Sequence, residues 1–125
     1  MPSRLRRLLL PDADKGVASG KPAANRTELS GRIEERGSLR YTPAGIPVIE
    51  FRVTHTSEQV EADSPRRVEC EMACVALGVN ALLLKEVPAG TTVTVTGFLA
   101  ARSLKQKAPV LHVTNIVFGE FAETI

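Results

Sequence analysis

The chain is poor in aromatic residues and in metal ligands. It has no tryptophan, one tyrosine and four phenylalanines among its 125 residues, so a folded core must be mostly aliphatic. Its two cysteines and two histidines argue against a disulfide framework and against a rich metal cluster. No apolar run approaches the ~20 residues that a membrane-spanning helix needs. With 43% hydrophobic and 24% charged residues, the composition fits one compact domain without a membrane partner.

A large excess of charge of either sign is also missing. The 16 lysines and arginines against 14 aspartates and glutamates leave a formal net charge of +2. Residues 1–24 carry five of these bases and two of these acids, or +3, whereas residues 25–125 carry eleven and twelve, or −1. A near-neutral body argues against a protein that grips duplex nucleic acid by bulk electrostatics. A nucleic-acid site in the body must therefore be a local stripe of basic residues.

The N-terminal segment lacks the features of an export signal. Arg4, Arg6 and Arg7 are followed by an apolar run of only three leucines, whereas a signal peptide needs at least ~7 apolar residues. We therefore expect a cytoplasmic protein with reduced cysteines. Residues 11–25 have linker composition. This predicts a flexible basic extension over residues 1–24, with a short helix over 3–10, that either has no specific task or trails along a nucleic-acid backbone.

From residue 27 the sequence alternates apolar and polar residues and is rich in β-branched side chains, which is typical of strands. Short connections favour antiparallel order. A tight turn is expected at Tyr41–Gly45, a long polar loop at Glu58–Pro65 and a basic loop at Leu104–Pro109. The expected strands are Thr27–Arg36, Pro47–Ser57, Arg66–Leu77, Thr92–Ala101 and Val110–Phe118, and the expected helix is Gly78–Val87.

Five strands with one short helix between the third and the fourth predict an all-β OB-fold, a five-stranded Greek-key barrel. An SH3-like barrel ranks second because it lacks a helix at this position. The expected organisation is the extension over residues 1–24, the OB-fold domain over 25–119 and a short C-terminal tail over 120–125.

The sequence has no motif typical of a catalytic or metal site. A glycine-flanked serine elbow, a paired-histidine helix, a phosphate loop and a dinucleotide fingerprint are all missing. A histidine acting as a base on Ser57 or Ser103 stays open, but we expect no enzyme, no cofactor and no metal. Cys70 and Cys74 lie about 13 Å apart if they share a strand, and a disulfide needs Cα atoms within ~7 Å. Both are expected to be small buried core residues.

The basic residues form a more coherent pattern than the acidic ones. The two loops that flank the ligand groove of an OB-fold are basic, and Arg52, Arg66 and Arg67 add charge on the strands between them. Such a strip, with an aromatic residue for stacking, suits single-stranded nucleic acid. The alternative is ordinary solubilising charge. The candidate contacts are Arg36, Arg40, Tyr41, Arg52, His55, Arg66, Arg67, Arg102, Lys105 and Lys107.

Acids and aromatics limit this interpretation. The acidic residues are scattered and are expected to be solvated surface, and Glu69 and Glu71 would repel phosphate if their face held the ligand. Tyr41 is the one plainly exposed candidate for stacking. Phe51 alternates with core residues, whereas Phe98 fits either face of its strand.

Several short motifs, in this order and spacing, resemble the bacterial single-stranded DNA-binding proteins. Within that superfamily the chain is more similar to the primosomal replication protein N (PriB) family. The resemblance covers about residues 25–119. The motifs are Leu29-Ser30-Gly31, Pro43-Ala44-Gly45-Ile46-Pro47, Phe51 with His55, Cys70-Glu71-Met72, Val95-Thr96-Gly97-Phe98 and Val110-Leu111-His112.

The resemblance implies a homodimeric, non-catalytic OB-fold protein of the bacterial replication-restart primosome. It implies binding of single-stranded DNA without sequence preference, stimulation of the PriA helicase, and a cytoplasmic, nucleoid-associated location. DnaT and single-stranded DNA-binding protein are further candidate partners. The chain departs from well-studied relatives at Glu69, where they carry a stacking tryptophan, at Thr56, where they carry an arginine, and in a shorter second basic loop. The acidic tail of the single-stranded DNA-binding proteins is also missing.

Three hypotheses follow. The first is a dimeric module that holds single-stranded DNA and PriA, with weaker and more salt-sensitive DNA binding than its relatives because of Glu69. The second is an assembly protein that acts mainly through protein contacts. The third, disfavoured by the missing tail, is a short single-stranded DNA-binding protein. The edge of Thr27–Arg36 is expected to pair in the dimer, since it has few safeguards against pairing.

Overall fold

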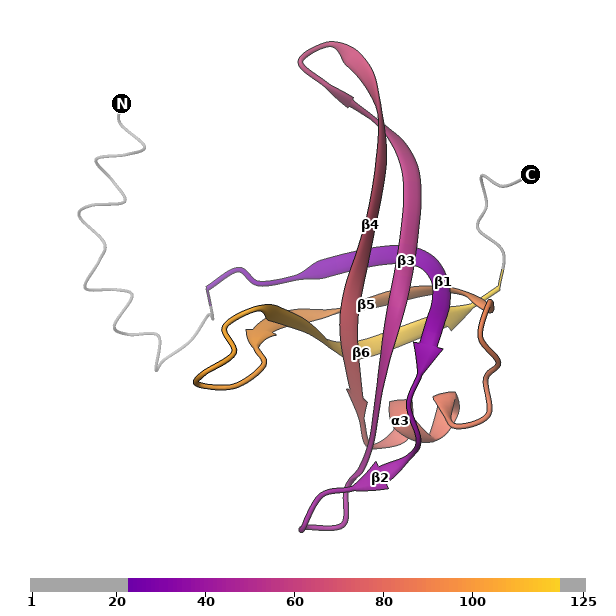
Figure 1. The fold of residues 1–125 in the computed structure, drawn as a ribbon, viewed down its shortest axis with the longest axis vertical. Coiled ribbons are helices and arrows are strands. Elements are labelled where there is room, and N and C mark those ends of the chain that lie inside the picture. Colours follow the sequence, from indigo (N-terminus) through magenta and orange to yellow (C-terminus); the bar gives the residue numbers. More distant parts are fainter. Residues whose placement is uncertain (1–22, 120–125) are drawn as a thin grey trace, which may run out of the picture.

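The structure, a computed structural model, describes residues 23–119, which form six strands and one short helix (Figure 1). The predicted extension over 1–24, except for its last two residues, and the predicted tail over 120–125 lie outside the described residues. No helix within 23–119 has the length and apolarity to cross a membrane. The elements are β1 (Thr27–Arg36), β2 (Arg40–Tyr41), β3 (Pro47–Glu61), β4 (Ser64–Leu77), α3 (Val79–Leu84), β5 (Thr92–Ala101) and β6 (Pro109–Phe118).

One sheet closes on itself as a barrel. Its strand order is β1-β5-β6-β4-β3-β2, and an additional pairing of β1 with β3 closes the five longer strands into a barrel, with the short β2 outside this ring. The curved strand β1 makes this closure: its first half pairs with β5, and its second half, from Arg32 onward, pairs with β3. At the crossing point, a side chain on Gly31 would run into the carbonyl oxygen of Thr54. Glycine is therefore required where β1 passes from one neighbour to the other.

The expectation of antiparallel order is wrong for one pair of strands. β4 and β6 are parallel and pair only through Cys74–Leu111, Val75–His112 and Ala76–Val113. The connection between them contains α3 and all of β5, so it is long enough for a parallel crossover.

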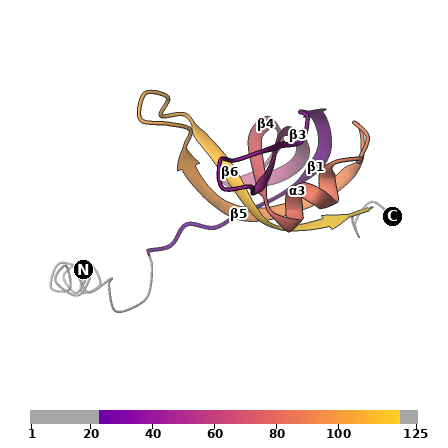
Figure 2. The same ribbon diagram turned by 90° about the horizontal axis from the view of Figure 1, so that it is seen from below.

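Helix α3 lies across one end of the barrel (Figure 2). It is shorter than the expected 78–87 because Gly78, with φ of 72°, lies outside it and the last turn ends at Lys85. Ala81 and Leu84 are fully buried. The helix therefore closes this end of the barrel with two side chains.

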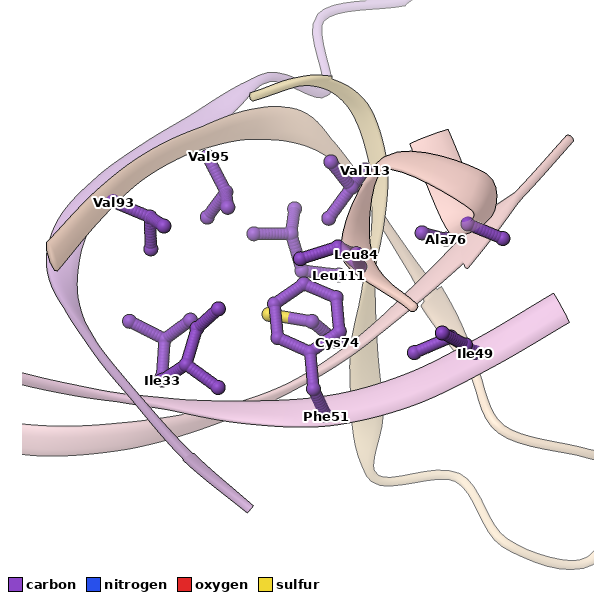
Figure 3. Packing of buried hydrophobic residues seen from close by; sticks show 12 residues of the cluster. Ile33, Ile49, Phe51, Cys74, Ala76, Leu84, Val93, Val95, Leu111 and Val113 are labelled. Carbon is purple, nitrogen blue, oxygen red and sulfur yellow. The ribbon is translucent and has the colours of Figure 1, made fainter. Parts of the chain in front are cut away.

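The barrel interior is aliphatic, as the shortage of aromatic residues predicts. Phe51 is its one buried aromatic residue, packed beside Cys74 and Leu111 (Figure 3). Within residues 23–119, no polar or charged residue is buried. The strand alternation correctly predicts the inward positions Ile33, Ile49, Phe51, Val53, Cys74, Val93 and Val95. The rest of the core cluster is Ala76, Ala81, Leu84, Leu111 and Val113.

The polar loop expected over residues 58–65 is instead the end of a long hairpin. β3 and β4 stay paired as far as Glu61 opposite Ser64, with only Ala62 and Asp63 between them. Both turn residues have positive φ, 53° and 65°, which matches the twist of a two-residue hairpin. We call residues 55–70 the arm, because beyond Thr54 and Glu71 the hairpin has no third strand beside it and projects from the barrel (Figure 1).

Candidate nucleic-acid interface

The two basic loops meet over the outer face of β3 and β4, as an OB-fold predicts. A hollow lies there, bordered by the end of β1, the first part of β3, the middle of β4 and the end of β5. We call it the groove. Its lining residues are Glu35, Arg36, Gly37, Glu50, Phe51, Arg52, Ala73, Cys74 and Arg102.

Glu50 brings the two loops together. Its Oε2 accepts a hydrogen bond from Nη2 of Arg40 at 2.9 Å, and its Oε1 lies 3.7 Å from Nη1 of Arg102. The sequence places Glu50 only on the polar face of its strand, and the structure shows that it holds two arginines from opposite ends of the barrel sequence. The cluster has one anion for two cations and a net charge of +1, so it is a ready site for a phosphate group.

Arg52 lies in the groove between two acids. Its Nε is 3.5 Å from Glu35 and its Nη1 is 3.7 Å from Glu71. The acids on this face therefore neutralise the central base of the predicted strip. Below it, burial raises the pKa of the Cys74 thiol to about 12, although the Arg52 charge acts in the opposite direction.

Arg36 has a structural task that the sequence pattern does not show. Its Nε donates to the carbonyl oxygen of Val87 and its Nη1 to that of Lys85, both at 2.8 Å. These are carbonyls just after α3, so Arg36 ties the end of the helix to β1. This guanidinium lines the groove, but part of its hydrogen-bonding capacity is already used.

The structure separates Arg66 and Arg67 from the groove. Both lie on the arm, where Arg66 pairs with Glu61 at 2.6 Å and Arg67 with Glu69 at 2.9 Å. Because the arm projects away from the barrel, these arginines do not continue the strip that the sequence suggested (Figure 1).

His55 also lies outside the groove lining, although it was expected on the groove. A carbonyl oxygen only accepts, so Nδ1 of His55 donates to Ser30 at 2.6 Å. In the neutral ring, Nε2 then accepts from the Ser57 hydroxyl at 2.7 Å, and that hydroxyl accepts from Gln59 at 2.9 Å. The chain of bonds fastens the base of the arm to β1 just past the last paired residues.

Cys70 faces His55 across the hairpin and is exposed, so the expectation that it belongs to the core is wrong. The alternation does place it on the same face of β4 as Cys74. At Cys70, however, β4 has left the barrel, so no layer covers that face.

The remaining candidates stay available to a ligand. Tyr41 has 60% of its surface exposed. Lys105 and Lys107 are exposed and, within residues 23–119, pair with no carboxylate. They belong to the same loop as Arg102, so they extend the cluster on Glu50 with uncompensated charge.

Two comparisons identify the family of this barrel. A family model described as "another single-strand binding protein family" matches residues 25–115. The replication restart protein PriB of Bordetella pertussis is 54% identical over 76 residues, which are 61% of this chain and 71% of that protein. The chain belongs to the PriB family of single-strand binding proteins. This family membership supports a role in replication restart that includes binding of single-stranded DNA.

Solved structures agree with the PriB assignment. PriB from Ralstonia solanacearum matches with a TM-score of 0.71 and 33% identity, over 78% of this chain and all of that one. The wild-type single-stranded DNA binding protein from Thermus aquaticus matches with a TM-score of 0.63 at 21% identity, over 78% of this chain and 50% of that one, which shows the fold alone. The predicted OB-fold is confirmed.

Sequence reasoning missed one exposed aromatic pair on this PriB-family barrel. The ring of Phe98 on β5 stacks on the ring of His112 on β6, on the outside of the sheet. A signal was available, because Val93 and Val95 point inward and the alternation continues through Gly97, which turns Phe98 outward.

Proposed function

We propose that this protein binds single-stranded DNA without sequence preference and supports replication restart by stimulating the PriA helicase. The observation that carries the proposal is the meeting of two basic loops on Glu50, with Lys105 and Lys107 uncompensated beside Arg102. A DNA phosphate would replace or join Glu50 between Arg40 and Arg102. Such contacts are made to the backbone and carry no sequence information.

The compensating acids set the expected strength of binding. Arg52 is paired with Glu35 and Glu71, and Glu69 stands where relatives are expected to stack a tryptophan on a base. Stacking contributes ~1–3 kcal/mol per base. The proposal therefore includes weaker and more salt-sensitive binding than is typical of the family.

Fluorescence polarisation of a labelled oligothymidine at several salt concentrations tests the proposal. For single strands, the slope of log K against log salt is about −0.7 per phosphate neutralised. Replacing Lys105 and Lys107 by alanine should lower the affinity and reduce the slope by about 1.4. The matched control is the double change Arg66→Ala and Arg67→Ala on the arm, which should leave the slope unchanged. If the two double variants lose affinity and slope equally, the DNA site does not lie at the basic loop of Lys105 and Lys107.

A substitution at Glu50 should raise the affinity for DNA, in contrast to the lysine substitutions, which should lower it. The Glu50→Gln variant removes the one anion that Arg40 and Arg102 share, so its affinity for oligothymidine should rise. A fall in affinity would mean that Glu50 positions the arginines rather than competing with phosphate for them.

A second function is favoured by the paired charges on the β3–β4 face. A face whose arginines are neutralised in place suits a protein partner better than a polyanion, which supports an assembly protein with PriA, DnaT or single-stranded DNA-binding protein as partners. Helicase stimulation that survives in a variant without measurable DNA affinity would select this alternative.

We also propose a homodimer formed through β1. The first half of β1 pairs with β5 on one side, whereas β3 covers its other side only from Arg32 onward. The carbonyl oxygen of Ser30 already accepts from His55, so the free edge lies before it, at residues 27–29, and it can accept a second copy of the chain. Size-exclusion chromatography with light scattering should give twice the chain mass, and a monomer would contradict the proposal.

A further inference from the structure

Phe98 and His112 form an aromatic pair that the barrel core does not need. Their ring centroids lie 5.1 Å apart and the rings are tilted by only 7°. Phe98 keeps 42% of its surface exposed although one side of its ring lies on His112. The inward residues of the same strand, Val93 and Val95, fill the barrel, so the stack stands on the opposite face of the sheet.

The stack is aligned with the cationic cluster of the groove. Phe98 is opposite His112, His112 is opposite Val75, and Val75 is opposite Glu50, which holds Arg40 and Arg102. These four residues form one row across β5, β6, β4 and β3. Neighbouring strands are ~4.8 Å apart, so His112 lies about 10 Å from the cluster on Glu50 along the row.

A second cationic side chain, that of Arg26, lies at the Phe98 end of the row. Thr27 is opposite Gly97, and the Asn25 side chain makes two hydrogen bonds of 2.9 Å with the backbone of Leu99. This register places Arg26 beside Phe98. Arg26 is exposed, and its carboxylate partner among residues 23–119, Glu28, is 4.0 Å away, which is a weak pair.

We propose that the Phe98–His112 pair is a stacking platform for a base of the bound single strand. Planar bases stack on aromatic rings irrespective of sequence, and their phosphates need cations on either side. The row provides both, with Arg40 and Arg102 at one end and Arg26 at the other. The platform lies on β5 and β6 and so is distinct from the β3–β4 position at which Glu69 stands. This inference rests on the proposed binding of single-stranded DNA and names the part of the barrel that holds a base.

Because the chain contains no tryptophan, a single indole reports on this site. The matched pair of variants is Phe98→Trp and Phe118→Trp, since Phe118 is 40% exposed and lies at the far end of β6. Addition of oligothymidine should quench most of the fluorescence of the first variant and leave that of the second unchanged. Binding seen by polarisation without quenching of the Phe98→Trp variant would overturn the platform and leave the proposed function standing.

Affinity measurements separate stacking from other roles of Phe98. Phe98→Leu keeps an apolar side chain and should lower the affinity for oligothymidine about fivefold, the lower end of stacking contributions. The affinity for an abasic strand of equal length should stay unchanged, as should the melting temperature. An equal loss for both strands, or a loss for neither, would contradict base stacking. If the unaltered protein binds no oligothymidine at all, the proposed function fails and the platform fails with it.

Discussion

The β3–β4 hairpin is one continuous element with two very different halves. In the barrel half, Val53 is fully buried and Cys74 is 2% exposed. In the arm, Val60 is 75% exposed, and Cys70 is exposed on the same face of β4 as Cys74. The alternation of side chains is the same in both halves. The two halves differ in their neighbours, because β1 and β6 pair with the barrel half of the hairpin and not with the arm.

This difference teaches that burial, and with it stability, comes from closure of the barrel and not from the strands themselves. A two-stranded hairpin is marginal in water. Besides its backbone pairing, the arm is held by the Arg66–Glu61 ion pair between its strands, by the Arg67–Glu69 pair within β4, and by the bonds from His55 to Ser30 and Ser57. The barrel half should therefore carry nearly all of the unfolding free energy, and four predictions test this division.

The largest effect is expected where two barrel strands approach most closely. A side chain on Gly97 of β5 would meet the carbonyl oxygen of His112 on β6. Backbone cannot move aside as a flexible side chain does, so Gly97→Ala should destabilise the protein by about 4 kcal/mol or more. Urea unfolding at fixed protein concentration measures this. A loss below about 1 kcal/mol would show that β5 and β6 can separate there without cost.

The second prediction compares one aliphatic residue from each half. Leu111→Ala empties part of the core and should cost about 2–5 kcal/mol. Val60→Ala on the arm should change the free energy of unfolding by less than about 0.5 kcal/mol, as exposed positions do. A similar cost for both variants would mean that something covers the arm in solution, a second copy of the chain first among the candidates.

The two cysteines also lie one in each half, Cys74 buried in the barrel and Cys70 exposed in the arm. This difference predicts a pH dependence of the unfolding free energy. Burial raises the pKa of Cys74 to about 12 from its ordinary value near 9. Above pH ~9 the unfolded chain loses this proton while the folded chain keeps it, so stability should fall by ~1.4 kcal/mol per pH unit up to about pH 12. The unfolding free energies of the protein and of Cys74→Ala should therefore converge as the pH rises.

The control for this effect is Cys70→Ala, whose thiol is exposed in the arm. Its unfolding free energy should follow that of the unaltered protein across the same pH range. Parallel curves for the protein and for Cys74→Ala would show that the buried thiol ionises in place.

Much of the barrel could be predicted from sequence, and the arm could not. The bounds of β1 and β5 are as expected, because Leu29, Ile33, Val93 and Val95 alternate with polar residues over the covered part of the sheet. The outer part of the arm, residues 58–65, is expected to be a loop because the sequence there is mostly polar, whereas the pairing of β3 with β4 continues to Glu61 and Ser64. Its turn, Ala62-Asp63, also lacks the Asn-Gly or Asp-Gly pair that marks a two-residue hairpin.

The residues of the candidate site could be predicted from the sequence, but the ion pairs and hydrogen bonds that they form could not. The basic character of the two loops is visible in the sequence, and the OB-fold brings them together. The role of Glu50 depends on contacts between residues 40, 50 and 102, and that of Arg36 on carbonyls some fifty residues away. Such partners follow from tertiary structure, so periodicity and composition do not reveal them.

The smallest effect is expected for the ion pairs of the arm. Arg66 and Glu61 are about two thirds exposed, and their charged atoms lie 2.6 Å apart. Exposed pairs contribute ~0–1 kcal/mol, because water screens the charges and ordering two long side chains costs entropy. A double-mutant cycle with Arg66→Ala and Glu61→Ala should therefore give a coupling of less than about 1 kcal/mol, falling further as salt is added.

A coupling of 2 kcal/mol or more would require a desolvated pair, because only loss of water strengthens it to that degree. The arm would then be buried in solution. The two halves of the β3–β4 hairpin would both be covered, the barrel half by β1 and β6 and the arm by another molecule. Repeating the cycle at several protein concentrations identifies that neighbour. A coupling that grows with concentration points to a second copy of the chain, consistent with the unpaired edge of β1 near the base of the arm. A small coupling that is independent of protein concentration would show that the arm is exposed to solvent and contacts no second copy of the chain.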